Sequence, residues 1–361
     1  MADTSLTEAG TPPRSASELF LVFAGISMQS FGGALTFIEK TVVRDKRWLS
    51  PTEFLGLYAI SQVLPGPTGI SFCVLLGDRF FGLRGAAAAL GGFLLLPSVV
   101  VIGVATLFKQ FQHVPQVQGA LHGMGAASVG FIVTTAARMS RTLRGQRTGI
   151  AVAVLSFAAA GLGRLPVSTV GVGRFVSLAG LEGPPPVSTS DLFALFLHFL
   201  SLSVFATGGA NALASDMHRY VVDQHGYITH TEFVNSIALA QAAPGPNIMF
   251  VTVMGWQIAG MQGALATTLG LSLPALIFPF VASRLGRRAQ FERVLKALQR
   301  GLGPVAIGLM ASTCFLLVRE APGVWKGAVM IAATIALLAL TRIPPVLLIL
   351  TAGVLGALIV W

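Results

Sequence analysis

The sequence predicts an all-α integral membrane protein that contains two homologous repeats in inverted topology. Composition, an internal repeat and the charges of the loops support this prediction in turn. Hydrophobic residues make up 54% of the 361 positions, glycine occupies another 41, and charged residues amount to 11%. Soluble domains carry about 25% charged residues, and no globular fold of this size hides so much apolar surface from water. The composition therefore excludes a cytosolic enzyme, a secreted domain and a disordered linker.

An ordered series of motifs occurs twice along the chain. Thr52-Glu53-Phe54 and Pro65-Gly66-Pro67 recur, at one constant offset, as Thr231-Glu232-Phe233 and Pro244-Gly245-Pro246. The later matches pair Gly77, Gly82, Gly85 and Pro97 with Gly255, Gly260, Gly263 and Pro274. An ordered series of this kind indicates two copies of one structural unit. We divide the chain into a polar N-terminal tail (1–17), a first repeat (18–181), a Pro/Gly linker (182–189) and a second repeat (190–361).

Each repeat is expected to supply about five membrane spans. A span needs about 20 apolar residues to cross a hydrocarbon core of about 30 Å. In the first copy the apolar runs of adequate length are 18–38, 86–108, 117–137 and 148–163. The second copy adds a fifth run at 344–361, whose counterpart at 166–181 is weak because it contains polar residues.

The segment 52–81 does not read as a span. Two apolar arms of about 13 residues flank Pro65-Gly66-Pro67, and at 1.5 Å per residue each arm reaches only about 20 Å. Pro65 removes a backbone donor, whereas Pro67 suits the first turn of a new helix. The sequence therefore predicts a re-entrant helical hairpin that is broken at Pro-Gly-Pro in each copy. Simple proline kinks in spanning helices are the alternative interpretation.

The loop charges predict that the two copies face opposite ways. After the first apolar run, copy one carries Lys40, Arg44, Lys46 and Arg47, and copy two carries Arg219. In the loop near 284–300 the bias reverses, because copy two there carries six basic residues against one in copy one. Basic loops stay on the cytoplasmic side, so opposite bias indicates inverted repeats. The same short basic tracts explain the net charge of +10 without nucleic-acid binding.

Broken helices in inverted repeats are typical of transporters, whose substrate site lies at mid-depth where the breaks meet. The half-helices that start at Pro67 and Pro246 direct their N-termini at the break, which favours an anion. Thr68 and Asn247 follow the breaks, and Lys40 is the nearest basic side chain in the sequence. The candidate substrate-binding residues are Gly32, Gly33, Lys40, Gln62, Pro65, Gly66, Pro67, Thr68, Gly208, Gly209, Gln241, Pro244, Gly245, Pro246 and Asn247.

Other functions find less support in the sequence. It contains no nucleotide-binding, zinc-hydrolase or serine-hydrolase motif, and no Asp, Glu or His cluster typical of an enzyme acting on a lipid phosphate. We therefore expect no catalytic residue, no cofactor and no metal site. Cys73 and Cys314 lie in apolar runs and are expected to be buried, not a disulfide pair. An anion channel and a carrier are both compatible with the sequence, and so is a homodimer.

Several of these motifs together resemble the chromate ion transporter family. The resemblance rests on Phe31-Gly32-Gly33-Ala34 with Trp48-Leu49, on Gln62 to Pro67, and on the second set from Gly208-Gly209-Ala210 to Asn247. It covers nearly the whole chain beyond residue 17. It implies a two-domain, multi-pass protein of the bacterial inner membrane, lying among lipids, that exports chromate and confers chromate resistance. Sulfate, another tetrahedral dianion, and other small anions are the related substrates that it implies.

Overall fold

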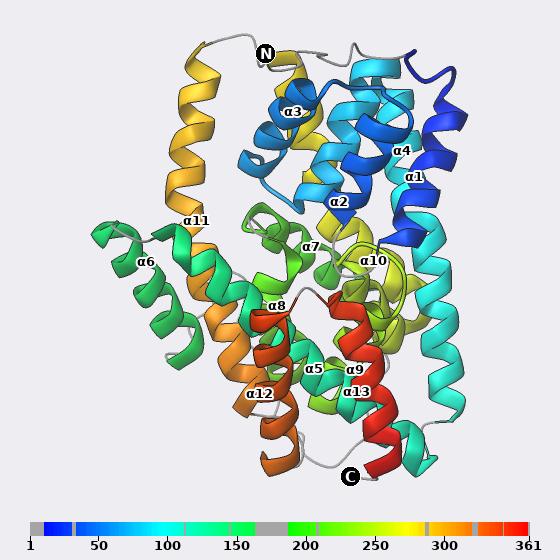
Figure 1. Cartoon of the computed structure of the whole chain (residues 1–361), viewed down its shortest axis with the longest axis vertical. Coiled ribbons are helices and arrows are strands. Elements are labelled where there is room, and N and C mark those ends of the chain that lie inside the picture. The colour runs from blue at the N-terminus through cyan, green and yellow to red at the C-terminus, as the bar shows by residue number, and fades with distance from the viewer. Residues whose placement is uncertain are drawn as a thin grey trace.

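The computed structural model describes residues 11–30, 34–111, 113–143, 146–162, 187–206, 209–285, 289–319, 324–341 and 343–359. These residues form helices and short turns, with no strand among them (Figure 1). In the first copy the helices are α1 (Ala16–Gln29), α2 (Ala34–Glu39), η1 (Lys40–Asp45), α3 (Pro51–Val63), α4 (Thr68–Gln110), α5 (Pro115–Ser140), η2 (Arg141–Leu143), α6 (Arg147–Phe157) and η3 (Ala158–Leu162). In the second copy they are α7 (Thr189–Val204), η4 (Ala210–Leu213), α8 (Ala214–His218), η5 (Arg219–Gln224), α9 (His230–Ala242), α10 (Met249–Leu285), α11 (Ala289–Arg319), α12 (Val324–Leu340) and α13 (Pro345–Ile359).

Three of the described helices are long and apolar enough to cross a membrane. They are Thr68–Gln110, Pro115–Leu143 and Met249–Arg284. Shorter apolar helices surround them, and many of their large side chains point outward, such as Leu21, Leu155 and Leu358. Because lipid can cover such side chains, the protein is a multi-pass membrane protein, as its composition predicts.

Matching residues start the matching helices of the two copies. Ser50 and Thr229 accept from the backbone amides of Glu53 and Glu232, whose carboxylates bond back to the cap residue in both cases. This capping box satisfies two amides that the first turn would otherwise leave unpaired. In the next position, α3 begins with Pro51 where α9 begins with His230. The same capping interactions therefore begin α3 in the first copy and α9 in the second.

The expected single span at 18–38 is wrong, because the helix ends at Gln29 and a second helix begins at Ala34. The chain then turns back: Lys46 Nζ, just after η1, lies 3.5 Å from Glu18 Oε1 at the start of α1. At a rise of 1.5 Å per residue, the 14 residues of α1 extend about 21 Å. Copy two repeats this path, since Tyr220 in η5 stacks on His198 in α7, with ring centroids 3.7 Å apart.

The helix is interrupted at both Pro-Gly-Pro motifs. Gly66 (φ 108°) lies between α3 and α4, and Gly245 (φ 144°) lies between α9 and α10. A second break follows inside the next helix of each copy, where Gly82 and Gly260 both have φ 57°. These breaks divide α4 into a half-helix (68–80) and a long helix (83–110), and α10 into a half-helix (249–258) and a long helix (261–285).

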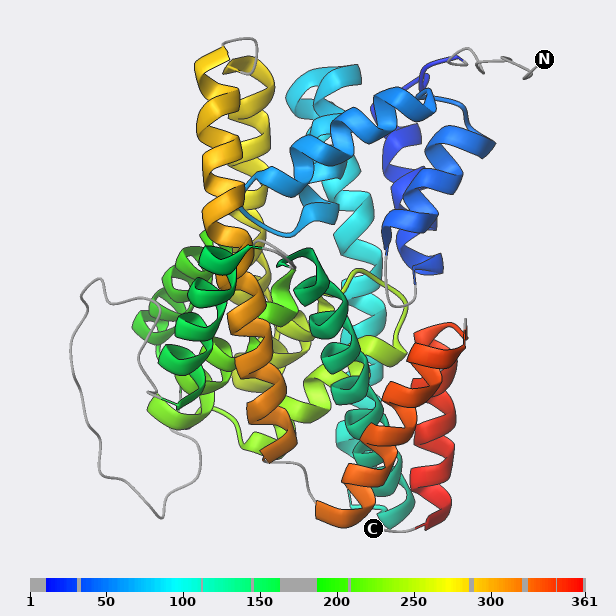
Figure 2. The same cartoon turned by 60° about the vertical axis from the view of Figure 1, so that its left-hand side comes forward.

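The two long helices run in opposite directions through the molecule. In Figure 1 the end of α4 and the start of α5 lie at the bottom, whereas the end of α10 and the start of α11 lie at the top. Figure 2 shows the same arrangement from the side, with α1 to α3 in the upper half and α12 and α13 in the lower half. The buried core sits between them, with Phe72, Phe93, Phe199 and Phe250 fully enclosed.

The remaining predicted spans follow the sequence more closely. The run 117–137 lies within α5, 148–163 becomes α6 and η3, and 344–361 contains α13. The run 166–181 and the Pro-rich part of the linker lie outside the described residues. Cys73 and Cys314 are free thiols.

Candidate functional site

Each Pro-Gly-Pro interruption packs against the long helix of the other copy. A Cβ atom added to Gly66 would lie 2.5 Å from Ala275 Cβ, in the middle of the long helix of α10. A Cβ atom added to Gly245 would lie 2.9 Å from Pro97 Cβ, in the middle of the long helix of α4. The two contacts are reciprocal, because Pro97 matches Pro274, the neighbour of Ala275. Both interruptions therefore lie near half the height of the long helices.

Glycine is required at these two points for two separate reasons. Both have positive φ, a backbone conformation that other residues adopt at a cost of about 1–2 kcal/mol. Both also lack the space for a side chain, because the opposite helix already occupies it. The sequence motif is thus explained by backbone geometry and by close approach together.

Each half-helix begins with backbone amides that precede its first intrahelical hydrogen bond. Ile70 and Ser71 donate to the carbonyl of Pro67, and Met249 donates to the carbonyl of Pro246. By their position, the amides of residues 68, 69, 247 and 248 come before the first of these bonds. The amide of Gly245 is different, because it donates to the carbonyl of Ser30 at the end of α1, at 2.9 Å. That bond ties the second interruption to the first copy.

The predicted polar residues differ in burial. Gln241 is buried at the end of α9, and its Oε1 has no hydrogen-bond partner within the described residues. Its counterpart Gln62 is exposed and donates to the hydroxyl of Tyr58 at 2.7 Å. Thr68 is half-buried, and Asn247 is exposed. Pro65, Gly66, Pro67 and Pro246 are buried, and Pro244 is half-buried.

The glycine pairs are described only in part. Gly32, Gly33 and Gly208 lie outside the described residues. Gly209 has φ 107°, and a Cβ added there would meet nothing within 4 Å. In the sequence, the first glycine pair lies between the end of α1 and the start of α2.

Basic side chains occupy corresponding positions in different surroundings. Lys40 begins η1 and is exposed. Arg219 begins η5 in the same place of copy two, and its guanidinium lies 2.5 Å from the carboxylate of Asp216. The side chains of Arg219 and Asp216 are 14% and 2% exposed. Copy two therefore contains a buried ion pair that no sequence pattern predicts.

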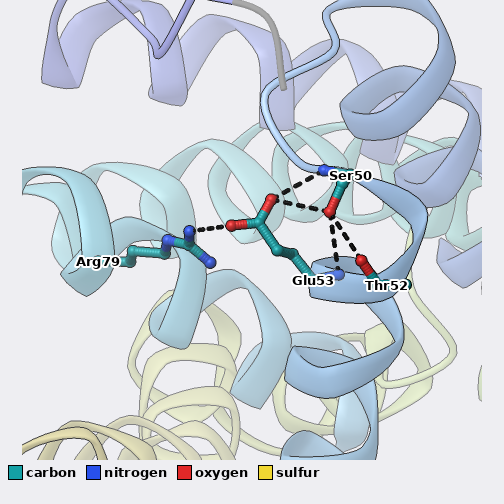
Figure 3. Close-up of polar contacts among 4 residues, drawn as sticks. All are labelled: Ser50, Thr52, Glu53 and Arg79. Carbon is teal, nitrogen blue, oxygen red and sulfur yellow. Dashed lines mark hydrogen bonds and ion pairs between the residues drawn. The ribbon is translucent and has the colours of Figure 1, made fainter. Parts of the chain in front are cut away.

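The arms of the first interrupted pair are joined at their outer ends (Figure 3). Glu53 near the start of α3 forms an ion pair with Arg79 near the end of the half-helix of α4. The backbone amide of Ser50 and, next, Arg79 hold the pKa of Glu53 below its usual value. In copy two the residue matching Arg79 is Gln257, whose Oε1 accepts from Ser236 at 3.2 Å. In each copy the two arms are thus also bonded to each other away from the break.

Sequence reasoning missed the partners of the interruptions. Pro97 and Pro274 matched in the repeat, but nothing in their spacing indicated that they face the other copy's Pro-Gly-Pro motif. The contact of Gly66 with Ala275 joins residues far apart in sequence, which a single sequence cannot reveal. Alanine at a close helix crossing is the kind of small residue that such packing selects.

The chain matches the chromate transporter family twice, over residues 17–181 and 193–357. The chain belongs to this family. The family consists of transporters and not of enzymes, so the protein is a membrane protein of chromate transport. Each match contains one Pro-Gly-Pro interruption with its flanking helices.

Several curated relatives support the family membership. A chromate transport protein of Pseudomonas aeruginosa is 27% identical over 401 residues, covering 99% of this chain and 96% of that protein. A chromate transport protein of Cupriavidus metallidurans is 22% identical, covering 91% of this chain and 88% of the relative. The uncharacterized transporter YwrA of Bacillus subtilis is 27% identical over 173 residues, which are 96% of its length but 46% of this chain. No solved structure matches the chain significantly.

Proposed function

We propose that the protein is a secondary transporter that exports chromate across the bacterial inner membrane and thereby confers chromate resistance. The observation that carries this proposal is the reciprocal contact of each Pro-Gly-Pro interruption with the long helix of the other copy. An interrupted helix at mid-depth is tolerated where it is buried in protein or lines a water-filled path. Two such interruptions packed across the repeats provide one shared site.

In this proposal the repeats have inverted topology. The opposite directions of the long helices of α4 and α10, and the opposite loop charges, support it. The pairs α3 with the half-helix of α4, and α9 with the half-helix of α10, are then re-entrant hairpins that enter from opposite faces. The match of YwrA, over 96% of its own length, to less than half of this chain fits a relative that contains one repeat.

The proposed anion site is built from backbone amides at the two breaks. The amides of residues 68, 69, 247 and 248 point along helix N-termini, and Thr68 and Asn247 add side-chain donors. Pro65, Gly66, Pro67, Pro244, Gly245 and Pro246 shape the breaks, and Gln62 and Gln241 lie beside them. Gly32, Gly33, Gly208 and Gly209 are the further glycines that we assign to the site from their place in the repeat. Exposed Lys40 attracts the anion towards this path.

The energetics require water or a cation at the site. Helix ends contribute about 0.3–1 kcal/mol each, whereas the removal of a charge from water costs several kcal/mol. Amides alone therefore cannot hold a dry dianion, and the site must be hydrated in its open state. The exposure of Asn247 and Gln62 fits a path that water can enter. Chromate and sulfate share the tetrahedral dianionic shape that such amides recognise.

The membrane potential favours export. Moving one charge across a potential of 100 mV changes its free energy by about 2.3 kcal/mol, and moving a dianion changes it by about 4.6 kcal/mol. With a negative interior this corresponds to a concentration ratio of about a thousandfold. Facilitated export of a dianion thus needs no further energy source.

Purified protein in liposomes tests the proposal. With an imposed potential, we expect chromate flux towards the positive side that saturates with chromate concentration. Gly66→Leu and Gly245→Leu should abolish that flux, while Gly56→Ala, whose added Cβ meets nothing within 4 Å, should not change it. A non-saturating current would favour the alternative, an anion channel. Flux of sulfate or another small anion without chromate flux would reassign the substrate, and no anion flux at all would overturn the proposal.

A further inference from the structure

The second copy contains two hydrogen-bonded histidines between its first two helical arms. His218 Nε2 lies 2.9 Å from His230 Nδ1. His218 is the last residue of α8, and His230 is the first residue of α9. The pair therefore connects α8 with α9, the helix that ends just before Gly245. Movement of α9 relative to α8 must strain or break this contact.

A carboxylate completes the cluster. His218 Nδ1 lies 3.7 Å from Asp223 Oδ1, on the side of the ring away from His230. The side chain of His218 is 5% exposed, whereas that of Asp223 is 52% exposed. Phe233 packs edge-on against the His218 ring, with centroids 5.0 Å apart. The cluster thus runs from a solvent-exposed carboxylate to a buried imidazole and on to a half-buried imidazole.

Other ionisable groups around the cluster have their own contacts. Asp216 is paired with Arg219, Asp191 on α7 is bound by Ser188 and Tyr227, and Glu232 on α9 is bound by Thr229. On the helices that pack against α9, α5 carries His122 and Arg138, and Arg138 donates to the Leu338 carbonyl. The other ionisable side chains of helices that pack against α8 or α9 are Asp78, Arg79, Arg84 and Lys109 on α4, Arg284 on α10, and Glu292, Arg293, Lys296, Arg300 and Arg319 on α11. The described parts of η3 and α13 carry no ionisable side chain. Asp223, whose Oδ1 lies 3.7 Å from His218 Nδ1, is a carboxylate that faces a charge on His218.

The contact depends on the number of protons that the pair carries. In the neutral pair one imidazole donates a single proton to the other. One added proton converts His218 into an imidazolium, whose Nε2–H donates to His230 and whose Nδ1–H faces Asp223. The charge-assisted bond to His230 is roughly twice as strong as a neutral one, and the imidazolium also attracts the Asp223 carboxylate, 3.7 Å from its Nδ1. A second added proton places N–H groups on both facing nitrogens, so the bond between the rings is lost.

The first copy lacks this cluster. Glu39, Arg44 and Pro51 occupy the positions of His218, Asp223 and His230. Within the described part of the chain no group of three metal-binding side chains has the geometry to hold an ion. Because histidine titrates near neutral pH, the ligand that this arrangement is suited to bind is a proton.

We propose that His218, His230 and Asp223 form a proton-binding site that couples proton uptake at one membrane face to the movement of the second copy's arms during anion transport. This inference rests on the proposed function, and it adds a proton as a coupled ion. Since the cluster occurs in one copy alone, the coupling acts from one face of the membrane.

Two variants and a control test the site. His230→Pro installs the residue that copy one has, which is favoured at a first helical position, and the preceding Thr229 is already extended. His218→Gln removes the other imidazole. The control His113→Gln removes an exposed histidine outside the cluster. All are placed in liposomes that contain a pH-sensitive dye, and chromate flux and proton movement are recorded from acidic to alkaline pH.

In the wild type we expect the chromate flux to change with pH near neutrality. Both cluster variants should retain chromate flux, but their flux should not depend on pH in this range. They should also move at least about tenfold fewer protons per chromate than the wild type. The control should behave as the wild type does. Chromate itself takes up a proton in this range, and the difference between variant and wild type removes that contribution. Unchanged proton movement in both variants would overturn the inference while leaving the proposed function intact.

A wild type without chromate flux would instead defeat the proposed function. The proton site is then judged by nitrogen NMR of histidine-labelled protein. A cluster as inferred gives two imidazoles whose titrations depend on each other, and His230→Pro must shift the titration of His218. An unshifted His218 titration would overturn the inference on its own.

Discussion

At the residue scale, the glycines of the two interruptions are the most constrained positions. Gly66 combines a φ of 108° with a contact that leaves no space for Cβ. Gly82 also has positive φ, but open space surrounds it. The difference separates a position that needs glycine for packing and conformation from one that needs it for conformation alone.

Substitution Gly66→Ala should lower the unfolding free energy by at least about 2 kcal/mol, from positive-φ strain and from overlap with Ala275. We expect a clear decrease in the Tm of the purified protein in detergent. Gly56→Ala on α3 is the matched control, since alanine suits a helix interior better than glycine; its Tm should stay the same or rise. The double variant with Ala275→Gly should recover part of the loss. Equal Tm values for Gly66→Ala and the control would contradict the packing described here.

Glu53 gives a prediction about pH. Its pKa is lowered in the folded protein, so its contacts stabilise the fold above the ordinary glutamate pKa of about 4.3 and lose this effect as the pH falls through the folded value. Glu53→Gln keeps a capping-box side chain but loses the charge that faces Arg79. The wild type should exceed this variant by about 0.2–1 kcal/mol at neutral pH, because the pair is partly exposed. A stability difference that persists in acid would show that charge is not the cause.

The backbone breaks at the two Pro-Gly-Pro motifs could be predicted at this scale, but their surroundings could not. Proline and glycine restrict the backbone locally, so Pro65-Gly66-Pro67 indicates a break wherever it occurs in an apolar run. The burial of Gln241 and the exposure of Gln62 depend on packing between the copies, and the matched motifs make the two look equivalent. The His218–His230 contact likewise arises from the meeting of two elements.

At the element scale, the α1–α2 path turns back before it crosses the molecule. The sequence does not predict this turn, because residues 18–38 form one continuous apolar run with glycines that are common in spanning helices. Hydrophobicity indicates contact with lipid or with the protein core. It does not distinguish a helix that crosses the membrane once from two helices that enter and leave on the same side.

A close glycine contact holds the half-helix and the long helix of α4 together. A Cβ on Gly77 would lie 2.3 Å from the carbonyl oxygen of Gly85, a backbone atom that cannot move aside. Gly77→Leu should therefore separate these helices, so that the variant neither folds correctly nor transports chromate. Folding is measured by monodispersity in detergent, and transport by chromate flux. Gly103→Leu, on the same helix in open space, should leave both unchanged. Normal flux from Gly77→Leu would show that the two helices are not packed as described.

At the scale of the whole molecule, the proposed inverted topology places corresponding loops on opposite faces of the membrane. Asp45 and Gln224 end the matching segments η1 and η5, and both are exposed. In a background without Cys73 and Cys314, Asp45→Cys and Gln224→Cys should react with an impermeant maleimide from opposite sides of the membrane. Labelling of both from the same side would exclude inversion and require an even number of crossings between them.

The central claim is that the anion passes between the two Pro-Gly-Pro interruptions, within reach of residues 66–68 and 245–247. Crystals of the protein soaked with chromate test it most directly, because chromium gives an anomalous signal that locates the ion without reference to the chain. We predict one principal peak between the interruptions, within hydrogen-bond distance of the amides that begin the half-helices of α4 and α10. A principal peak elsewhere in the membrane region, with none between the interruptions, would contradict this account.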